Sequence, residues 1–288
     1  MSLAEGLPDL PYPKLPLRDA IILAYSTYFR HFTDALRVSW LWLIVVAAFT
    51  GYAHWQQWSW MAVAMATAVP PQMQKAGEAV LLLSFANILM LFAGVSIAVA
   101  WHRLLILNEQ PGFGISNVVT NNLWRYVLIA IGLLLILFLP VMASMMFPVF
   151  YMMMSASSGA LLSILLIFAA YAAGSAVALR LTLLLPAQAI GDTHLTFAQT
   201  WNRTRGNIWR LFWGVFATTV PPLLIVQIAF VVVMPPVLPG TAGENVAVRM
   251  TAMSTVFAVF YLLVVPIGIG FLSHAYRHFF QTPLELPE

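Results

Sequence analysis

Three arginines and two tryptophans lie close together in the second half of the sequence. Arg203, Arg205 and Arg210 fall within eight residues, and Trp201 and Trp209 flank them. A guanidinium group presents parallel N–H donors that match phosphate oxygens, and an indole ring favours the depth of lipid headgroups. The cluster therefore predicts a site for anionic lipid phosphates or for a partner protein. The alternative is an ordinary cationic anchor that orients the chain in a membrane.

Two further arginines belong to the same prediction. Arg103 and Arg180 each stand at the end of an apolar tract, on the side that carries most of the basic residues. We expect both to share the lipid- or partner-binding role. Nucleic acid is not expected as a partner, because so few arginines held against a bilayer make too small a footprint for a polyanion.

Residue types that support catalysis or metal binding are sparse. His274 and His278 are four residues apart and would share a helix face, as metal or haem ligands can. No Asp or Glu stands at ligand spacing beside them, so we interpret them as polar groups at the membrane interface. The segment 157–159 (Ser-Ser-Gly) is similar to a serine-hydrolase loop but has no His or Asp nearby, and the chain has no cysteine. We therefore expect no enzyme, no cofactor and no metal ion.

The elements that carry these residues are long tracts without charge. The 54 residues between Arg125 and Arg180 contain no Asp, Glu, Lys or Arg, and 61% of the chain is hydrophobic against 8% charged. A membrane-crossing helix needs about 20 mostly apolar residues to pass roughly 30 Å of hydrocarbon. The sequence therefore predicts an all-α integral membrane protein, a six-helix transmembrane bundle. The expected crossings are 38–60, 79–101, 126–147, 160–180, 211–233 and 252–274.

The basic residues predict the orientation. Eleven of the 13 Lys and Arg residues fall on the side of both chain ends, and the other side holds Lys75 and Arg249. Because an excess of Lys and Arg marks the cytoplasmic side, we expect a multi-pass protein of the bacterial inner membrane with both termini in the cytoplasm. The expected division is an N-terminal cytoplasmic segment with an amphipathic helix (1–37), a membrane domain (38–280) and a cytoplasmic tail (281–288).

Three amphipathic stretches each precede a pair of expected crossings. They are 17–32, 116–122 and 196–205, and their apolar residues recur at helical spacing. Such stretches are typical of interfacial helices that lie in the membrane plane with the apolar face down. We predict three tandem units on the cytoplasmic side, each an elbow helix followed by a helical hairpin. The alternative is that basic, aromatic cytoplasmic ends make any multi-span protein look repetitive.

Polar groups inside the expected crossings are few. No Asp, Glu, Lys or Arg lies deep within any of them, so a proton- or sodium-coupled transporter is not expected. Asn87 and Gln227 are interpreted as interhelical hydrogen-bond partners rather than substrate ligands. The crossing at 160–180 is rich in alanine and glycine, which lets another backbone approach closely. We expect it to be a tightly packed central helix.

Prolines interrupt three crossings, at Pro140, at the pair Pro221 and Pro222, and at Pro266. A proline removes a backbone donor and leaves a carbonyl that neighbours or water must satisfy. Broken helices also line the sites of transporters. The prolines therefore keep a transport function open as an alternative.

One segment carries a resemblance. It runs Leu-Leu-Leu-Pro-Ala-Gln-Ala-Ile, a Gly/Asp turn, an amphipathic stretch, and then Trp-Asn-Arg-Thr-Arg-Gly-Asn-Ile-Trp-Arg-Leu-Phe. It resembles an element of bacterial polytopic proteins related to the membrane domain of glycerophosphodiester phosphodiesterases, the YciC-like proteins and the Yip1-like proteins. The similarity covers about 186–213 well, 17–42 loosely and the rest by topology alone. It implies a helical membrane domain with elbow helices, and hydrolytic activity is not expected because no soluble phosphodiesterase domain is recognisable.

The function expected from these features is that of a non-enzymatic scaffold, assembly or regulatory subunit. Its elbow helices would bind membrane lipids, anionic ones included, another membrane protein or a second copy of the chain. The alternative is a transporter or channel for a small neutral or amphiphilic solute. A polar cavity at mid-membrane near Gln227 and Asn87 would favour transport, and a fully packed dry interior would favour the scaffold.

Overall fold

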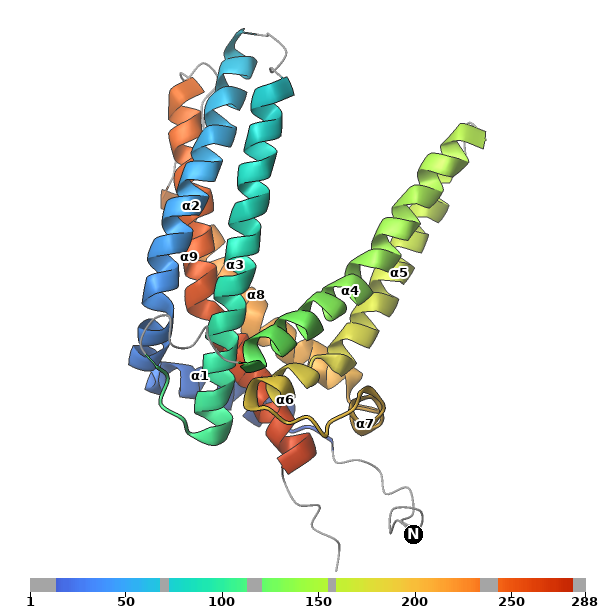
Figure 1. The fold of residues 1–288 in the computed structure, drawn as a ribbon. Helices are drawn as coiled ribbons and strands as arrows, with labels where there is room; N and C mark the ends of the chain where they lie inside the picture. Colours follow the sequence, from blue (N-terminus) through green and yellow to red (C-terminus); the bar gives the residue numbers. More distant parts are fainter. Residues whose placement is uncertain (1–13, 68–72, 113–120, 155–158, 234–242, 282–288) are drawn as a thin grey trace, which may run out of the picture.

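The computed structural model describes residues 14–67, 73–112, 121–154, 159–233 and 243–281, and the regular elements in those ranges are all helical (Figure 1). In chain order they are α1 (Leu17–Arg30), α2 (Phe32–Thr67), α3 (Met73–Leu107), α4 (Asn121–Met154), α5 (Gly159–Leu181), α6 (Leu184–Ile190), α7 (Phe197–Arg203), α8 (Ile208–Val233), α9 (Gly243–Tyr276) and the π-helical η2 (Arg277–Gln281). The all-α prediction is confirmed.

The long helices coincide with the predicted crossings, because each of the six ranges falls within α2, α3, α4, α5, α8 or α9. By length and composition, five described segments can cross a membrane: Phe32–Ala62, Lys75–Leu107, Leu165–Ile190, Ile208–Ala229 and Val246–Gln281. A shorter apolar segment, Leu123–Leu139, belongs to α4. These segments identify a multi-pass helical membrane protein.

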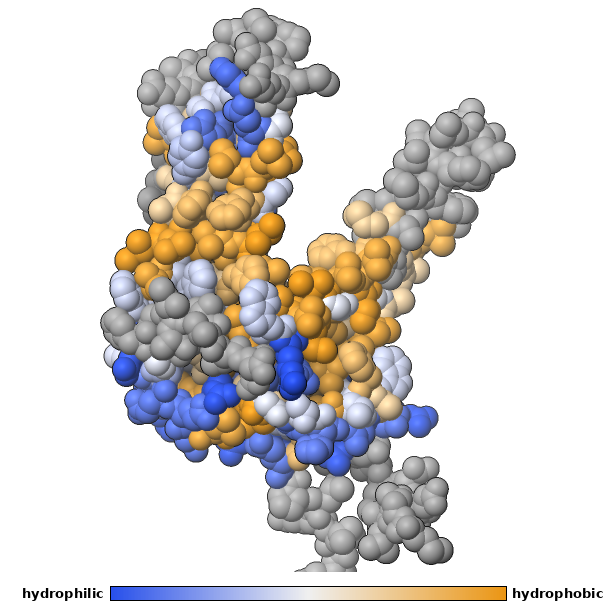
Figure 2. Space-filling model, viewed as in Figure 1, coloured by the Kyte–Doolittle hydropathy of each residue, from blue (hydrophilic) through white to orange (hydrophobic). Residues whose placement is uncertain are grey.

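Two groups of helices diverge from a common end. We call α2, α3 and α9 the bundle arm, because α2 and α3 both pack along α9, and α4 with α5 the hairpin arm. The arms touch where the rings of Phe92 on α3 and Trp124 on α4 lie 5.8 Å apart. Farther from that contact the arms separate, and Figure 2 shows an open wedge with hydrophobic surface on both sides.

The bundle arm is longer than a bilayer core is thick. At 1.5 Å per residue, the 36 residues of α2 span about 54 Å, against roughly 30 Å of hydrocarbon. The excess length lies at the end of the bundle arm that is far from its contact with the hairpin arm, and hydrophilic side chains appear again there (Figure 2). The bundle arm therefore reaches the headgroup layer and beyond at its far end.

At the joined end, α1, α6, α7 and η2, with the connecting turns and the adjoining ends of the long helices, form what we call the basal layer, and hydrophilic surface covers it (Figures 1 and 2). Two contacts bring the ends of the described chain together there. The backbone N–H of Leu15 donates to Oδ1 of Asn207 at 2.9 Å, and Nη1 of Arg203 donates to the carbonyl of Phe279 at 2.8 Å. Both ends of the described chain therefore lie on the same side of the molecule.

The expectation that the crossing at 160–180 is a central helix is wrong. This helix, α5, lies at the outside of the hairpin arm, and Ala172 and Ala173 are exposed. Close backbone approach does occur, because a Cβ on Gly174 would stand only 3.0 Å from the carbonyl oxygen of Ile136 on α4. The small residues therefore serve a tight two-helix hairpin and leave an alanine-rich face toward the membrane.

Two of the three predicted elbow helices fall on described residues. α1 and α7 correspond to the stretches 17–32 and 196–205. Of the stretch 116–122, residues 116–120 lie outside the described residues, and α4 begins at Asn121. The tandem repeat of three units therefore stays a prediction. The predicted lipid-facing side of α1 packs in part on α8 and α9 instead. Tyr28 is buried and Leu17, Ile21 and Tyr25 are partly buried, while Phe29 is 68% exposed.

Two tyrosines of α1 hydrogen-bond the proline-interrupted helices. Pro221 has no N–H for the carbonyl of Ala217 four residues earlier, and Tyr25 Oη donates to that carbonyl at 2.8 Å. Tyr28 Oη donates at 3.0 Å to the carbonyl of Leu263, which lies within one turn before Pro266 in α9. The expectation that a neighbour satisfies carbonyls freed by proline is met at Ala217, and the neighbour is an elbow helix.

Candidate functional site

The segment that carries the predicted arginines is shaped by local caps. α6 ends at Gly191, which adopts the left-handed conformation (φ 81°) typical of a helix C-cap. α7 begins with a capping box in which Thr196 and Gln199 satisfy each other's backbone N–H groups. After α7, Gly206 has φ 76°, and α8 starts two residues later. These turns hold the short helix α7 across the end of α8.

Buried polar groups fasten this segment to the rest of the molecule. Asn207, only 1% exposed, accepts the N–H of Leu15 and so joins the start of α8 to the residues before α1. Tyr276 Oη donates to Oδ2 of Asp192 at 2.8 Å and joins the end of α9 to the turn after α6. The sequence analysis did not single out Asn207 or Asp192, because neither partner can be inferred from local spacing.

Arg180, at the C-terminal end of α5, is held against α7. Its guanidinium lies over the Trp201 ring at 3.5 Å from the centroid. It also donates to the Trp201 carbonyl and, at 3.3 Å, to Oγ1 of Thr204. A guanidinium stacked on an indole gains a cation–π contact and keeps its planar donors in one orientation. The structure thus brings together two residues that the sequence analysis assigned to one site.

Arg203 and Arg210 bond to main-chain carbonyls. Arg203 donates to the carbonyl of Phe279 and lies 5.3 Å from the centroid of the Phe280 ring. Arg210 donates to the carbonyl of Leu15. Each guanidinium has five N–H donors, so these bonds fix its position and leave other donors unused. The two residues therefore stabilise the basal layer and still carry full positive charge.

Arg103 stands apart from the other predicted arginines. Its Nε and Nη2 donate to the carboxylate of Glu109 at 2.8 and 2.9 Å, and Nη1 donates to the carbonyl of Ala189 at 3.2 Å. The bidentate ion pair neutralises its charge locally. Of the predicted binding residues, Arg103 is thus the one least suited to hold a phosphate.

Arg205 and Trp209 are the most accessible members of the predicted site. The Trp209 side chain is 71% exposed. Arg205 is exposed, and its side chain makes no hydrogen bond or ion pair within the part of the chain that the structure describes. Arg205 and Arg180 are near enough to repel each other electrostatically. An anion that lies between two such cations would relieve this repulsion.

The positive charge of this region is not neutralised internally. Over the described ranges, ion pairs join His31 with Asp34 and Arg103 with Glu109. Further interactions involve Arg37, Glu78, Arg249 and Arg277. The remaining arginines of the predicted site therefore have no carboxylate partner there: Arg180, Arg203, Arg205 and Arg210. The basal layer thus presents a positive potential to whatever lies beside it.

An aromatic edge borders these charges. Its exposed rings come from α7 and the first turns of α8: Phe197, Trp201, Trp209, Phe212 and Trp213. Phe212 packs edge-on against both Trp209 and Trp213, with centroids 6.0 and 5.3 Å apart. Exposed indole and phenyl rings beside arginines are typical of the headgroup level of a bilayer. The edge therefore combines exposed rings and cations in one region, as a membrane interface requires.

Three further histidines lie on α3, α9 and η2. His274 is on α9, His278 is on η2, and the ring nitrogen Nε2 of His274 is buried without a partner among the described residues. His102 is fully buried and shares hydrogen bonds with Ser273 at 2.7 Å and with Tyr126 at 3.4 Å. No group of three or more His, Cys, Asp or Glu residues in the described ranges could hold a metal ion.

Asn87 and Gln227 were expected to hydrogen-bond between helices, but neither makes such a bond among the described residues. Asn87 is exposed on α3 and Gln227 is half-buried on α8, and neither side-chain amide has a hydrogen-bond partner among the described residues. Asn87 lies one helical turn beyond Leu91, and Gln227 one turn beyond Leu223. Leu91 and Leu223 pack against the same apolar cluster, at the junction of the arms. The amides therefore follow this cluster, one turn farther from the basal layer.

The basal layer as a whole combines guanidinium groups fixed by carbonyl contacts with exposed indole rings. Such an arrangement is suited to binding anionic oxygens at headgroup depth. Comparisons with protein-family models, with curated proteins and with solved structures found no match to this chain.

Proposed function

We propose that the chain is a non-enzymatic membrane scaffold, an assembly or regulatory subunit, whose basal layer binds anionic lipid. The observation that carries this proposal is the set of four arginines without a carboxylate partner in the described ranges, namely Arg180, Arg203, Arg205 and Arg210. Three of them are held by main-chain carbonyls, so their orientation is set before a ligand arrives. Such preorganisation lowers the entropy that binding costs.

The proposed topology has six crossings, with both chain ends on the cytoplasmic side of a bacterial inner membrane. Two observations support it. The ends of the described chain meet at the basal layer, as expected for an even number of crossings, and this supports counting α4 together with the five longer segments. The basal layer also carries most of the arginines, as a cytoplasmic face does.

Lipid is favoured over a protein partner at this surface because the exposed side chains alternate between rings and cations. A protein interface is usually depleted of charge at its centre, whereas a headgroup layer accepts both kinds of side chain. A second membrane protein or a second copy of the chain would compete for the same aromatic edge. Either would appear as a stoichiometric complex in the experiment below.

The test compares two arginines that differ in position but not in charge. Arg205→Gln removes the accessible cation beside Arg180, and Arg18→Gln removes an exposed cation from α1. Native mass spectrometry of the purified protein would measure retention of phosphatidylglycerol and of phosphatidylcholine. We expect Arg205→Gln to lower phosphatidylglycerol retention several-fold, while Arg18→Gln leaves it unchanged. Phosphatidylcholine retention should not respond to either substitution.

Two results would contradict the proposal. Equal losses in the two variants would show that total charge matters and that the arginines are an ordinary anchor. A protein that retains no phosphatidylglycerol, and purifies as a stoichiometric complex through its aromatic edge, would assign the surface to a protein partner.

Transport of a small neutral or amphiphilic solute is a second candidate, and the amides of Asn87 and Gln227, which have no hydrogen-bond partner among the described residues, favour it. The chain has no cysteine, so an Asn87→Cys variant carries one reporter thiol. A membrane-impermeant maleimide that labels this thiol in intact membranes would indicate an aqueous path to the middle of α3 and favour transport. Protection from labelling would indicate that lipid surrounds this position and favour the scaffold.

A further inference from the structure

A cavity of about 350 Å³ opens between α2 and α3 at the end far from the basal layer. α2 contributes Tyr52, Gln56, Ser59 and Trp60, and α3 contributes Lys75, Glu78, Ala79 and Leu82. Ligand pockets in proteins begin at roughly 300 Å³ and combine apolar walls with a few convergent polar groups. The cavity therefore has the size and lining of a site for a small group.

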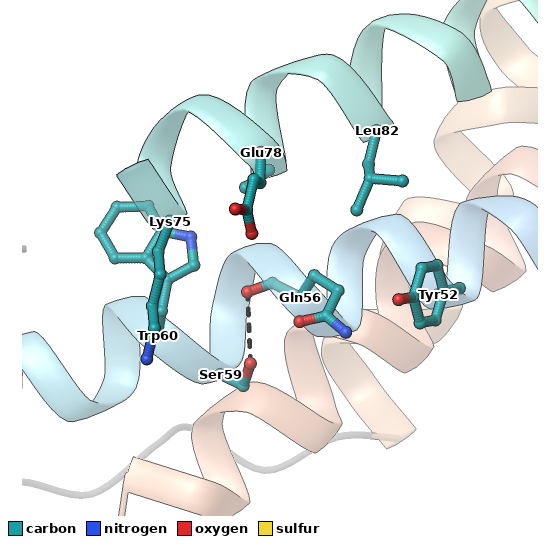
Figure 3. A pocket seen from close by; sticks show the side chains of 8 residues that line it. Tyr52, Gln56, Ser59, Trp60, Lys75, Glu78 and Leu82 are labelled. Atoms are coloured by element: carbon teal, nitrogen blue, oxygen red, sulfur yellow. Dashed lines mark hydrogen bonds between the residues drawn. The ribbon is translucent and has the colours of Figure 1, made fainter. Parts of the chain in front are cut away.

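The charged lining is unusual for this side of the molecule. Away from the basal side the sequence has only four charged residues, and Lys75 and Glu78 are two of them. Figure 3 shows the Glu78 carboxylate pointing between the helices toward Gln56 and Ser59, with Lys75 beside Trp60 at one end of the cavity. One site thus holds both a cation and an anion.

Neutral donors and aromatic faces complete the lining. The indole nitrogen of Trp60 is buried and has no hydrogen-bond partner among the described residues. Tyr52 and Trp60 lie toward opposite ends of the cavity, with Gln56 and Ser59 between them (Figure 3). An indole face attracts an ammonium group, and an indole N–H donates to an anionic oxygen. Each charge of a ligand would therefore find a charged and an aromatic partner.

The depth of the cavity matches the far headgroup layer. At 1.5 Å per residue along α3, Leu82 lies roughly 31 Å and Lys75 roughly 42 Å from Arg103 at the basal end. The hydrocarbon core is about 30 Å thick, and the headgroups extend the bilayer to about 40–45 Å. If Arg103 stands at the inner headgroups, the cavity spans the outer ones.

We propose that the cavity between α2 and α3 binds a zwitterionic phosphoethanolamine group, such as the headgroup of a phospholipid in the outer leaflet. The ammonium lies against Glu78 and the Trp60 face, and the phosphate lies against Lys75 and the Trp60 N–H. The site is independent of the basal layer, so it stands or falls separately from the proposed function. A free zwitterion of the same chemistry, dissolved outside the membrane, is the other source to be distinguished.

The experiment measures lipid retention by native mass spectrometry in mild detergent. It uses the full chain carrying Arg205→Gln, so that phosphatidylglycerol held at the basal layer does not mask the cavity. Its probes are dioleoyl phosphatidylethanolamine and dioleoyl phosphatidylglycerol, which share the phosphate and differ in the ammonium. Glu78→Gln should lower phosphatidylethanolamine retention about tenfold, the cost of one lost charge-assisted hydrogen bond, and abolish the preference over phosphatidylglycerol. Lys75→Gln should weaken both lipids. Trp60→Phe keeps a ring and removes the indole N–H, so it should weaken both lipids less than Lys75→Gln does.

Matched controls change the same charges at the other end of the molecule. Asp19→Asn on α1 controls for Glu78→Gln, and Lys14→Gln controls for Lys75→Gln, because all four side chains are exposed. Neither control should alter phosphatidylethanolamine retention. Equal retention of the two lipids by the Arg205→Gln chain without a cavity substitution would overturn the proposal, as would full retention of phosphatidylethanolamine after Glu78→Gln is added.

Competition with soluble glycerophosphoethanolamine distinguishes the two sources. Displacement of the lipid at equimolar concentration would support the site and identify a dissolved zwitterion as its ligand. If soluble glycerophosphoethanolamine did not displace a lipid whose retention depends on Glu78, the site would be supported and the membrane lipid would be identified as its ligand.

Discussion

The basal layer and the hairpin arm are held together by different forces. In the basal layer, hydrogen bonds join residues far apart in the chain, such as Leu15 with Asn207 and Tyr276 with Asp192. In the hairpin arm between Tyr126 and Arg180, the described side chains make no hydrogen bond to another helix. There, contact depends on close packing such as that of Gly174 on α4.

This difference locates the specificity of the fold. Directional bonds to buried groups define one arrangement, because a misplaced donor or acceptor stays unsatisfied. Packing of apolar helices in lipid gains little over contact with acyl chains, so it defines the angle between the arms only weakly. We infer that the basal layer fixes the architecture and that the surrounding bilayer influences the opening of the wedge.

The largest expected effect compares one glycine in each region. A Cβ on Gly214 of α8 would stand 1.9 Å from the Phe271 ring of α9, whereas a Cβ on Gly132 of α4 would meet nothing within 4 Å. Because the fully buried Phe271 has no room to move, Gly214→Ala should lower the free energy of unfolding by about 3 kcal/mol or more. Tryptophan fluorescence during thermal unfolding in detergent would measure it.

Gly132→Ala is the matched control. It should leave the unfolding temperature unchanged or raise it slightly, because alanine favours helix over glycine by up to about 1 kcal/mol. Equal destabilisation by the two substitutions would show that the hairpin arm is packed as specifically as the basal end.

A second comparison removes a buried amide. Asn207→Ala deprives the Leu15 N–H of its acceptor and should cost about 1–3 kcal/mol of the free energy of unfolding. Asn202→Ala, at an exposed position on α7, should change it by less than about 0.5 kcal/mol. The same thermal unfolding measurement applies to both. If Asn207→Ala left the free energy of unfolding unchanged, the residues before α1 would not need this contact.

A third prediction concerns Tyr25 and the alkaline limit of stability. Tyr25→Phe removes the donor to the Ala217 carbonyl and should cost about 1 kcal/mol at neutral pH. Burial raises the pKa of the Tyr25 phenol above its ordinary value of 10.0. The unfolded chain therefore ionises first, so this stabilising contribution is complete below pH 10 and declines as the pH rises above it. Unfolding temperatures measured from pH 8 to pH 11 should fall less steeply for Tyr25→Phe than for the unchanged chain.

The smallest effect is expected at Asn87 on α3. Asn87→Leu removes an amide that has no partner among the described residues, so the free energy of unfolding should change by less than about 0.5 kcal/mol. Thermal unfolding in detergent and in nanodiscs would both report it. A marked loss of stability confined to nanodiscs would reveal a partner for Asn87 that exists only in the membrane, such as a second copy of the chain.

The helices could be predicted from sequence because each depends on local composition. The apolar tracts alone place 38–60 within α2 and 211–233 within α8, and the amphipathic spacing of 17–32 predicts α1. The same composition assigned Arg180 and Trp201 to one side of the membrane, and the structure adds that they are in contact. These features need no knowledge of which helices are neighbours.

Helix neighbours could not be predicted, and the errors follow from that. The alanines of α5 indicate close approach but do not say whether one helix or several approach, so its position at the edge was missed. Arginine spacing does not show whether a guanidinium faces a phosphate or the carbonyl of Phe279, 76 residues away. The partner of Asn207 is 192 residues distant, beyond any local pattern.

The contact between Leu15 and Asn207 also sets an order of assembly. During synthesis the N-terminal residues emerge first, yet their acceptor belongs to a segment made after the first 206 residues. Until then the amide of Leu15 depends on water or on a transient helper for its hydrogen bond. The contact between Leu15 and Asn207 can therefore form only after more than two thirds of the 288 residues have been made, and a chain truncated before Asn207 would expose the segment around Leu15 to proteolysis.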